Sequence, residues 1–129
     1  MNKKSLFTSL AILILPIIAF FGLTFDKSSS TVAHASGRPQ IIKFSSNMCI
    51  ECKEVERIFR KLLPKYSKKF EYTEIIVDNN NDMNNKMIKK YKVTLVPTII
   101  MLNSDGSPYI RIEGSIPEDE MEEYIKGLK

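Results

Sequence analysis

The chain has 129 residues, of which 43% are hydrophobic and 26% charged, with two cysteines and a formal net charge of +4. This composition fits one globular domain and excludes disorder throughout. Two cysteines exclude a scaffold of several disulfides, and with one histidine they are too few for a four-ligand zinc site unless carboxylates take part. From Ser36 onward basic residues exceed acidic ones by only two, without a basic block containing aromatics, so nucleic acid is not an expected partner.

The first 35 residues are interpreted as a membrane anchor followed by a short polar linker. The 21 residues from Ser5 to Phe25 carry no charge, and as a helix they would span about 30 Å, the hydrocarbon thickness of a bilayer. Because Lys3 and Lys4 precede this run, the rest of the chain is expected on the extracytoplasmic side.

A cleaved secretory signal is the alternative for the same segment. Ala33-His34-Ala35 has the small-x-small pattern of a cleavage site, and cleavage after Ala35 would release a secreted protein. The apolar run is longer than a usual signal core of about 7–15 residues, which favours the anchor. Both alternatives export residues 36–129 to a compartment in which disulfides persist.

The exported part is predicted to begin with a strand and an amphipathic helix. Residues 41–44 are rich in β-formers, and the helix should start near Cys49. It should weaken at Pro64, because proline disfavours helical conformation in the residue before it. Five apolar residues at helical spacing predict the buried face of this helix: Val55, Ile58, Phe59, Leu62 and Leu63.

A second strand and a second helix are expected next. Residues 70–77 form a β-rich run that predicts the strand. The polar residues 79–82 could begin a helix, but a solvated loop is preferred. Apolar residues at helical spacing over 83–91 predict core contacts of a helix.

The remaining pattern predicts a β-hairpin and a last helix. Strands are expected over 98–102 and 109–113, antiparallel and joined by the turn residues 103–106. Pro117 and the acids after it mark a helix N-terminus. The order β-α-β-α-β-β-α indicates the α/β class, a mixed four-stranded sheet with helices on both faces, preceded by the N-terminal hydrophobic helix.

The concentrated chemical signal of this sequence is Cys49-Ile50-Glu51-Cys52, at the junction of the first strand and helix. Unpaired N–H groups and the positive dipole end of a helix stabilise a thiolate, which is the reactive form of cysteine. Cys52 lies three residues later on nearly the same helix side, within reach of a disulfide after a small shift. The pair can therefore cycle between dithiol and disulfide.

Three other uses of this motif have less support. Haem attachment requires histidine after the second cysteine, where this chain has Lys53. Zinc would need two further ligands, and His34 lies in the leader. A purely structural disulfide over so short a loop would restrain little unfolded-chain entropy. Redox exchange is therefore the favoured interpretation.

The segment from Ile41 to Leu128 resembles a domain of the thioredoxin family. Its CxxC at a strand-to-helix junction is similar to the family's active site, and Val96-Pro97-Thr98 resembles the loop in which that family has a cis proline facing the disulfide. The predicted order corresponds to a minimal thioredoxin-like core, residues 36–129, without the family's first strand and helix.

The resemblance implies a role for each matching residue. Cys49, as the exposed thiol, would attack the partner sulfur, and the more buried Cys52 would resolve the mixed disulfide. Val96 would pair with an extended substrate segment, and Pro97 would line the same groove and prevent metal capture by the thiols. No cofactor is implied.

The sequence departs from thioredoxin at several positions near this site. Met48 stands where the family usually has tryptophan, and Ile50-Glu51 replaces Gly-Pro. Lys43 aligns with the family's buried aspartate, and Glu74 with its partner lysine. We therefore predict a charge-swapped pair that assists proton transfer at Cys52, the alternative being an ordinary solvent-facing pair on neighbouring strands.

The sequence as a whole predicts an exported, membrane-tethered thiol–disulfide oxidoreductase. Its partners would be cysteine-containing exported proteins or peptides, and a quinone-linked oxidase or a transmembrane electron carrier in the membrane would recharge the cysteine pair. Glu51 disfavours a thiolate and so favours a reducing or isomerising role, whereas export favours oxidation, so the direction stays open. The alternative function is a non-catalytic, thioredoxin-like peptide-binding accessory module.

Overall fold

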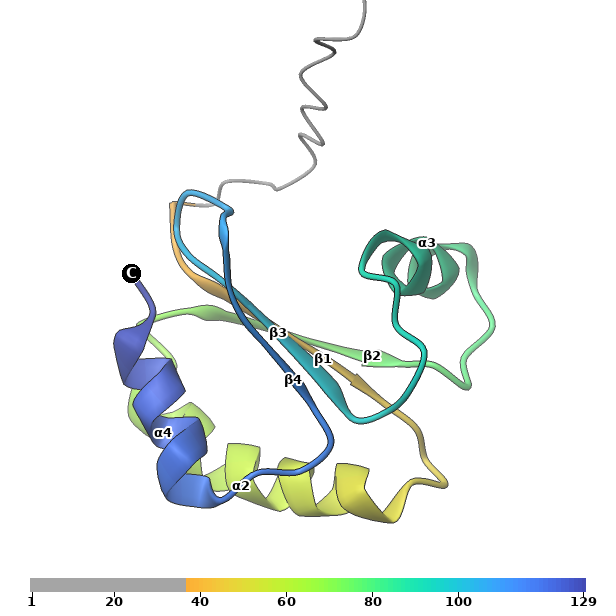
Figure 1. The fold of residues 1–129 in the computed structure, drawn as a ribbon, viewed down its shortest axis with the longest axis horizontal. Helices are drawn as coiled ribbons and strands as arrows, with labels where there is room; N and C mark the ends of the chain where they lie inside the picture. Colours follow the sequence, from red (N-terminus) through yellow and green to blue (C-terminus); the bar gives the residue numbers. More distant parts are fainter. Residues whose placement is uncertain (1–36) are drawn as a thin grey trace, which may run out of the picture. The chain divides into compact units, whose positions relative to one another are not determined.

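The computed structural model describes residues 37–129, in which one four-stranded sheet lies between helices (Figure 1). The sheet order is β2-β1-β3-β4, in which β1 is parallel to β2 and antiparallel to β3, and β3 is antiparallel to β4. The strands are β1 (Gln40–Ser45), β2 (Glu71–Ile76), β3 (Thr98–Leu102) and β4 (Pro108–Glu113). The predicted mixed α/β sheet is confirmed, whereas the apolar run of residues 5–25 lies outside the described residues.

Within residues 37–129, three helices cover the two faces of the sheet (Figure 1). Helices α2 (Ile50–Tyr66) and α4 (Glu118–Gly127) lie on one face, and α3 (Asp82–Lys90) lies on the other. Because side chains of a strand alternate between faces, Ile41 packs in the core under α2 and α4, whereas Ile42 packs in the core on the α3 side. Lys43, which has the parity of Ile41, consequently faces α2.

The predicted end of the first helix differs from the structure. The first helix does not weaken at Pro64 but continues to Tyr66. Leu62 is buried, and Leu63 and Tyr66 pack against the core, so tertiary packing holds the last turn despite the local preference.

The helices within residues 37–129 do not include one with the length and apolar character that a membrane span requires.

The preferred interpretation of residues 79–82 as a solvated loop is wrong at its C-terminal end. Asn81 is the N-cap of α3, and Asp82 is the first helical residue. The Asn81 side-chain oxygen accepts a 2.8 Å hydrogen bond from the backbone N–H of Asn84. Asparagine caps a helix in this way because its oxygen satisfies one of the N–H groups that have no partner within the helix.

Candidate functional site

Cys49 and Cys52 lie where β1 ends and α2 begins. Cys49 is the N-cap of α2 in extended conformation, and its Sγ accepts a 3.1 Å hydrogen bond from the backbone N–H of Cys52. The two cysteines form a disulfide, with their Cα atoms 5.2 Å apart. The sulfur of Cys49 therefore sits at the positive end of the helix dipole, where negative charge is stabilised.

The two sulfur-bearing residues differ in exposure. Cys52 is 3% exposed and belongs to the buried face of α2, whereas Cys49 is half-buried. This difference follows from the helix period, since Cys52 shares the stripe of Val55 and Phe59, while Cys49 precedes the first helical turn. A partner protein can reach Cys49 without disturbing the core, but it cannot reach Cys52.

The structure brings Val96 and Pro97 next to the disulfide. The peptide bond between them is cis, and Pro97 is buried. Cys49 Sγ lies 3.7 Å from the carbonyl oxygen of Val96. On the other side of this loop, the carbonyl oxygen of Pro97 accepts a 2.8 Å hydrogen bond from the N–H of Gly114, which ties the loop to the end of β4.

Asp78 holds the turn that leads into Cys49, a role that the sequence analysis missed. One carboxylate oxygen of Asp78 accepts hydrogen bonds from the hydroxyl of Ser46, at 2.9 Å, and from the N–H of Asn47, at 2.8 Å. The Ser46 hydroxyl oxygen in turn accepts from the N–H of Met48. The order of the strands could have indicated this role. Because β1 and β2 are parallel, the residues that follow them, Ser46 and Asp78 among them, meet at one end of the sheet.

Lys43 and Glu74 lie opposite each other on β1 and β2 and form an ion pair, with Nζ and Oε1 2.7 Å apart. Lys43 is only 1% exposed, so the alternative of two solvent-facing side chains is wrong for Lys43, whereas the side chain of Glu74 is 36% exposed. The hydroxyl of Ser45 also donates to Glu74 Oε1, at 2.8 Å. The carboxylate thus satisfies the buried ammonium and itself retains contact with solvent.

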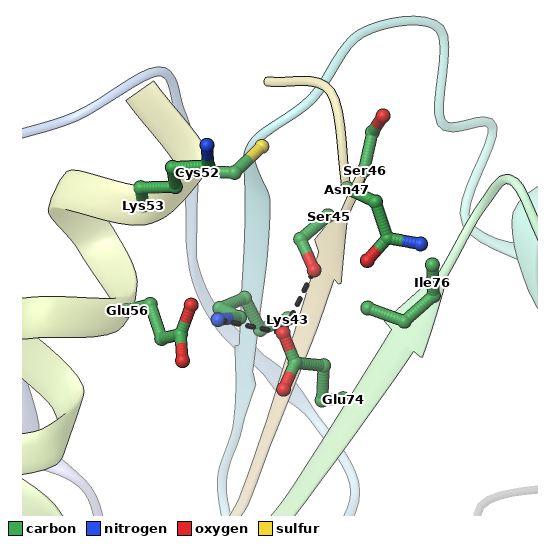
Figure 2. Close-up of a pocket in the computed structure, with 9 residues that line it drawn as sticks. All are labelled: Lys43, Ser45, Ser46, Asn47, Cys52, Lys53, Glu56, Glu74 and Ile76. Atoms are coloured by element: carbon green, nitrogen blue, oxygen red, sulfur yellow. Dashed lines mark hydrogen bonds and ion pairs between the residues drawn. The ribbon is translucent and has the colours of Figure 1, made fainter. Parts of the chain in front are cut away.

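A pocket of about 120 Å³ connects this ion pair with Cys52. Figure 2 shows the Lys43 amine between the carboxylates of Glu74 and Glu56, below the Cys52 side chain. A hydrogen bond from the Arg60 guanidinium holds the pKa of Glu56 below its usual range, with a smaller contribution from the charge of Lys43. Two carboxylates and one buried ammonium therefore share a pocket with Cys52.

The described residues offer little for binding a metal ion. Within residues 37–129 no three histidine, cysteine, aspartate or glutamate side chains come together in an arrangement that could hold one. In that same part of the chain, every buried side-chain nitrogen and oxygen atom has a hydrogen-bond partner.

Comparison with known proteins gives a consistent set of similarities. The sequence model of a thioredoxin-like domain family matches residues 27–129. A thioredoxin of Borreliella burgdorferi is 34% identical over 89 residues, which cover 69% of this chain and 72% of that protein. The thiol:disulfide interchange protein DsbD of Salmonella typhimurium is 28% identical over 96 residues, which cover 70% of this chain but only 17% of DsbD.

Solved structures show the same similarity. The germline-specific thioredoxin Deadhead of Drosophila melanogaster superimposes with a TM-score of 0.62 at 25% sequence identity. The match covers 74% of this chain and 85% of the Deadhead chain. A thioredoxin of Fasciola hepatica matches with the same TM-score, identity and coverage.

Proposed function

This chain belongs to the thioredoxin-like family, and we propose that it is an oxidoreductase that exchanges disulfides with cysteines of exported proteins or peptides. One observation carries the proposal. A half-buried Cys49 at a helix N-terminus is paired with a buried Cys52 and lies beside the carbonyl of Val96. This arrangement offers one sulfur to a partner and keeps the other as an internal reactant.

The proposed exchange transfers two electrons between the substrate cysteines and the Cys49–Cys52 pair, and it needs no cofactor. When the disulfide oxidises a substrate dithiol, one substrate thiolate attacks Cys49 Sγ and Cys52 leaves as a thiolate. The second substrate thiolate then attacks the substrate sulfur of the mixed disulfide and releases Cys49, so two electrons pass to the protein. The reverse sequence reduces a substrate disulfide, with Cys49 as the attacking thiolate.

Val96 and Pro97 are proposed to line the substrate groove. The Val96 backbone adjoins Cys49 Sγ, so an extended substrate segment that reaches this sulfur also passes the peptide groups of Val96. Backbone pairing there would align the substrate sulfur with little dependence on its side chains. Pro97 carries no N–H and is buried, so it would form the floor of this groove without offering a hydrogen-bond donor.

The proposed setting is extracytoplasmic, with the N-terminal run of residues 5–25 as a membrane anchor or, alternatively, as a signal cleaved after Ala35. The uncharged run behind Lys3 and Lys4 supports this placement. A membrane redox partner, either a quinone-linked oxidase or a transmembrane electron carrier, would recharge the cysteine pair. Similarity to a thiol:disulfide interchange protein is compatible with such a partner.

The test of the function is insulin reduction by the full chain in the presence of dithiothreitol, followed as turbidity. The wild type is expected to accelerate precipitation, and Cys49→Ser is expected to reduce the rate to that of the reaction without protein, because the accessible sulfur is removed. A Cys49→Ser variant as active as the wild type would contradict the proposal. Full biological function of Cys49→Ser/Cys52→Ser would instead support the peptide-binding alternative.

Lys43 and Glu74 are proposed to assist proton transfer at Cys52. Both line the pocket that Cys52 lines, and this pocket is large enough for water to connect them. Glu74 keeps one side toward solvent, so it can pass a proton between the pocket and bulk water. The buried ammonium of Lys43 would favour the anionic sulfur that forms when the disulfide opens.

Glu74→Gln is expected to slow disulfide exchange several-fold near neutral pH. The difference should shrink at high pH, because a thiol that is already ionised needs no proton acceptor. Stopped-flow rates across pH, with Glu71→Gln on the same strand as the matched control, measure this effect. Rates identical to the wild type at every pH would remove the proposed role of Glu74.

A further inference from the structure

Basic side chains gather around the turn that follows α2, at the end of the sheet opposite Cys49 (Figure 1). Lys65 lies in the last turn of α2, Lys68 and Lys69 follow the helix, and Arg38 reaches the same turn from the start of the described chain. These four residues are here called the basic cluster. Residues 64–69 line a pocket of about 280 Å³, and three of these six residues are lysines.

Hydrogen bonds fix the basic cluster on the folded domain. The Arg38 guanidinium donates to the carbonyl oxygens of Ser67, at 3.1 Å, and Phe70, at 3.0 Å. The ammonium of Lys69 donates to the carbonyl oxygen of Lys126 in α4. These cations cover carbonyl groups near the C-terminal ends of α2 and α4, which would otherwise repel an anion.

Carboxylates offset only part of this positive charge. Glu122 forms an ion pair with Lys65, and Glu71 is exposed where β2 begins. Lys68 is exposed and lies beyond the last helical turn, so stabilisation of the helix dipole does not account for it. Four cations against these two carboxylates leave a surplus of two positive charges around the pocket.

The described chain begins beside the basic cluster. Gly37 is its first residue, and residues 26–36, which separate Gly37 from the uncharged run of residues 5–25, can span at most about 40 Å. An anchor in residues 5–25 would therefore keep this end of the domain within reach of the membrane surface. Anionic lipid headgroups attract lysine and arginine side chains that come close to that surface.

We propose that the basic cluster binds anionic headgroups of the membrane that holds the anchor, and keeps Cys49 on the side of the domain away from the bilayer. This inference rests on the proposed anchored, extracytoplasmic setting and adds an orientation to it. Lysines around a pocket offer charge-assisted hydrogen bonds to the phosphodiester of a headgroup. The six residues of β1 separate the cluster from the turn before Cys49 by about 20 Å, so the reactive sulfur would face exported substrates.

The test measures acetylation of individual lysines in the full chain, reconstituted into neutral phosphatidylcholine vesicles or into vesicles that also contain anionic phosphatidylglycerol. An uncharged N-hydroxysuccinimide ester serves as reagent, and mass spectrometry gives the rate at each lysine. Lys68 should react at least about fivefold more slowly in the anionic vesicles, and molar salt should abolish this protection. Lys53, next to Cys52 at the opposite end of the sheet, is the internal control and should react equally in both vesicles.

Lys68→Gln should lower the protection of Lys65 several-fold, because one cation of the cluster is lost. Lys86→Gln is the matched control, because Lys86 is exposed but lies on α3, and it should leave the protection of Lys65 unchanged. Equal rates at Lys68 in both kinds of vesicle, or protection of Lys53 as strong as that of Lys68, would overturn the proposed orientation.

Two further outcomes separate this inference from its alternatives. Soluble polyphosphate that protects Lys68 equally well in neutral vesicles would assign the cluster to a soluble polyanion and overturn the membrane as its occupant. A chain that floats with anionic vesicles but not with neutral ones, with Lys68 protected, would contradict the anchor alone and support the basic cluster.

Discussion

Cys52→Ser is expected to leave the protein covalently joined to its substrate through Cys49. In the wild type, Cys52 is held three residues from Cys49, with Cα atoms 5.2 Å apart, so its attack on a mixed disulfide is intramolecular. Well-oriented intramolecular reactions have effective molarities on the order of 10⁵ M or more, far above the concentration of any external thiol. Without Cys52 the intermediate should persist instead of being resolved.

Non-reducing electrophoresis and mass spectrometry of a Cys52→Ser protein mixed with a disulfide-containing substrate measure this effect. The Cys52→Ser variant should accumulate a disulfide-linked adduct that dithiothreitol cleaves. Cys49→Ser and Cys49→Ser/Cys52→Ser should accumulate none. An adduct formed by Cys49→Ser would assign the attack to Cys52 and reverse the two roles. Absence of an adduct with a free Cys49 thiol would show that Cys49 is not the attacking group.

Glu74→Ala is expected to lower the free energy of unfolding by about 2–3 kcal/mol. Removing one partner of a buried ion pair costs about 3–5 kcal/mol, because the remaining charge stays buried without compensation. Lys43 is 1% exposed and would be that charge. The nearby carboxylate of Glu56 can interact with this charge in part, so the expected loss lies just below that range (Figure 2).

The reciprocal variant Lys43→Met should cost less, within about 1 kcal/mol of the wild type. The side chain of Glu74 is 36% exposed, so it can be hydrated when the ammonium is gone, and Ser45 still donates to it. Urea denaturation of the wild type, both single variants and Lys43→Met/Glu74→Ala measures the asymmetry. Equal losses in the two single variants would mean that Lys43 is not the uncompensated charge.

The periodicity of the sequence determined the element order and the class of sheet. Ile41 and Ile42 pack into cores on opposite faces of the sheet, because side chains of a strand alternate with a period of two residues. The apolar stripe of α2 from Val55 to Leu62 packs against the sheet. Local rules failed at element ends. Pro64 predicted that the first helix weakens, but Leu63 and Tyr66 pack on the core and the helix continues past it. Asn81 was predicted to lie in a loop, but its side chain caps α3.

The sequence by itself determined that two cysteines capable of forming a disulfide stand at a helix start, because their spacing and the helix N-terminus are local properties. Only the tertiary structure decided what surrounds them. The 3.7 Å approach of the Val96 carbonyl, the burial of Lys43 against Glu74 and the support from Asp78 join residues from separate strands and loops. Such distances depend on how β1, β2 and β3 align, and register is set by side chains far apart along the chain.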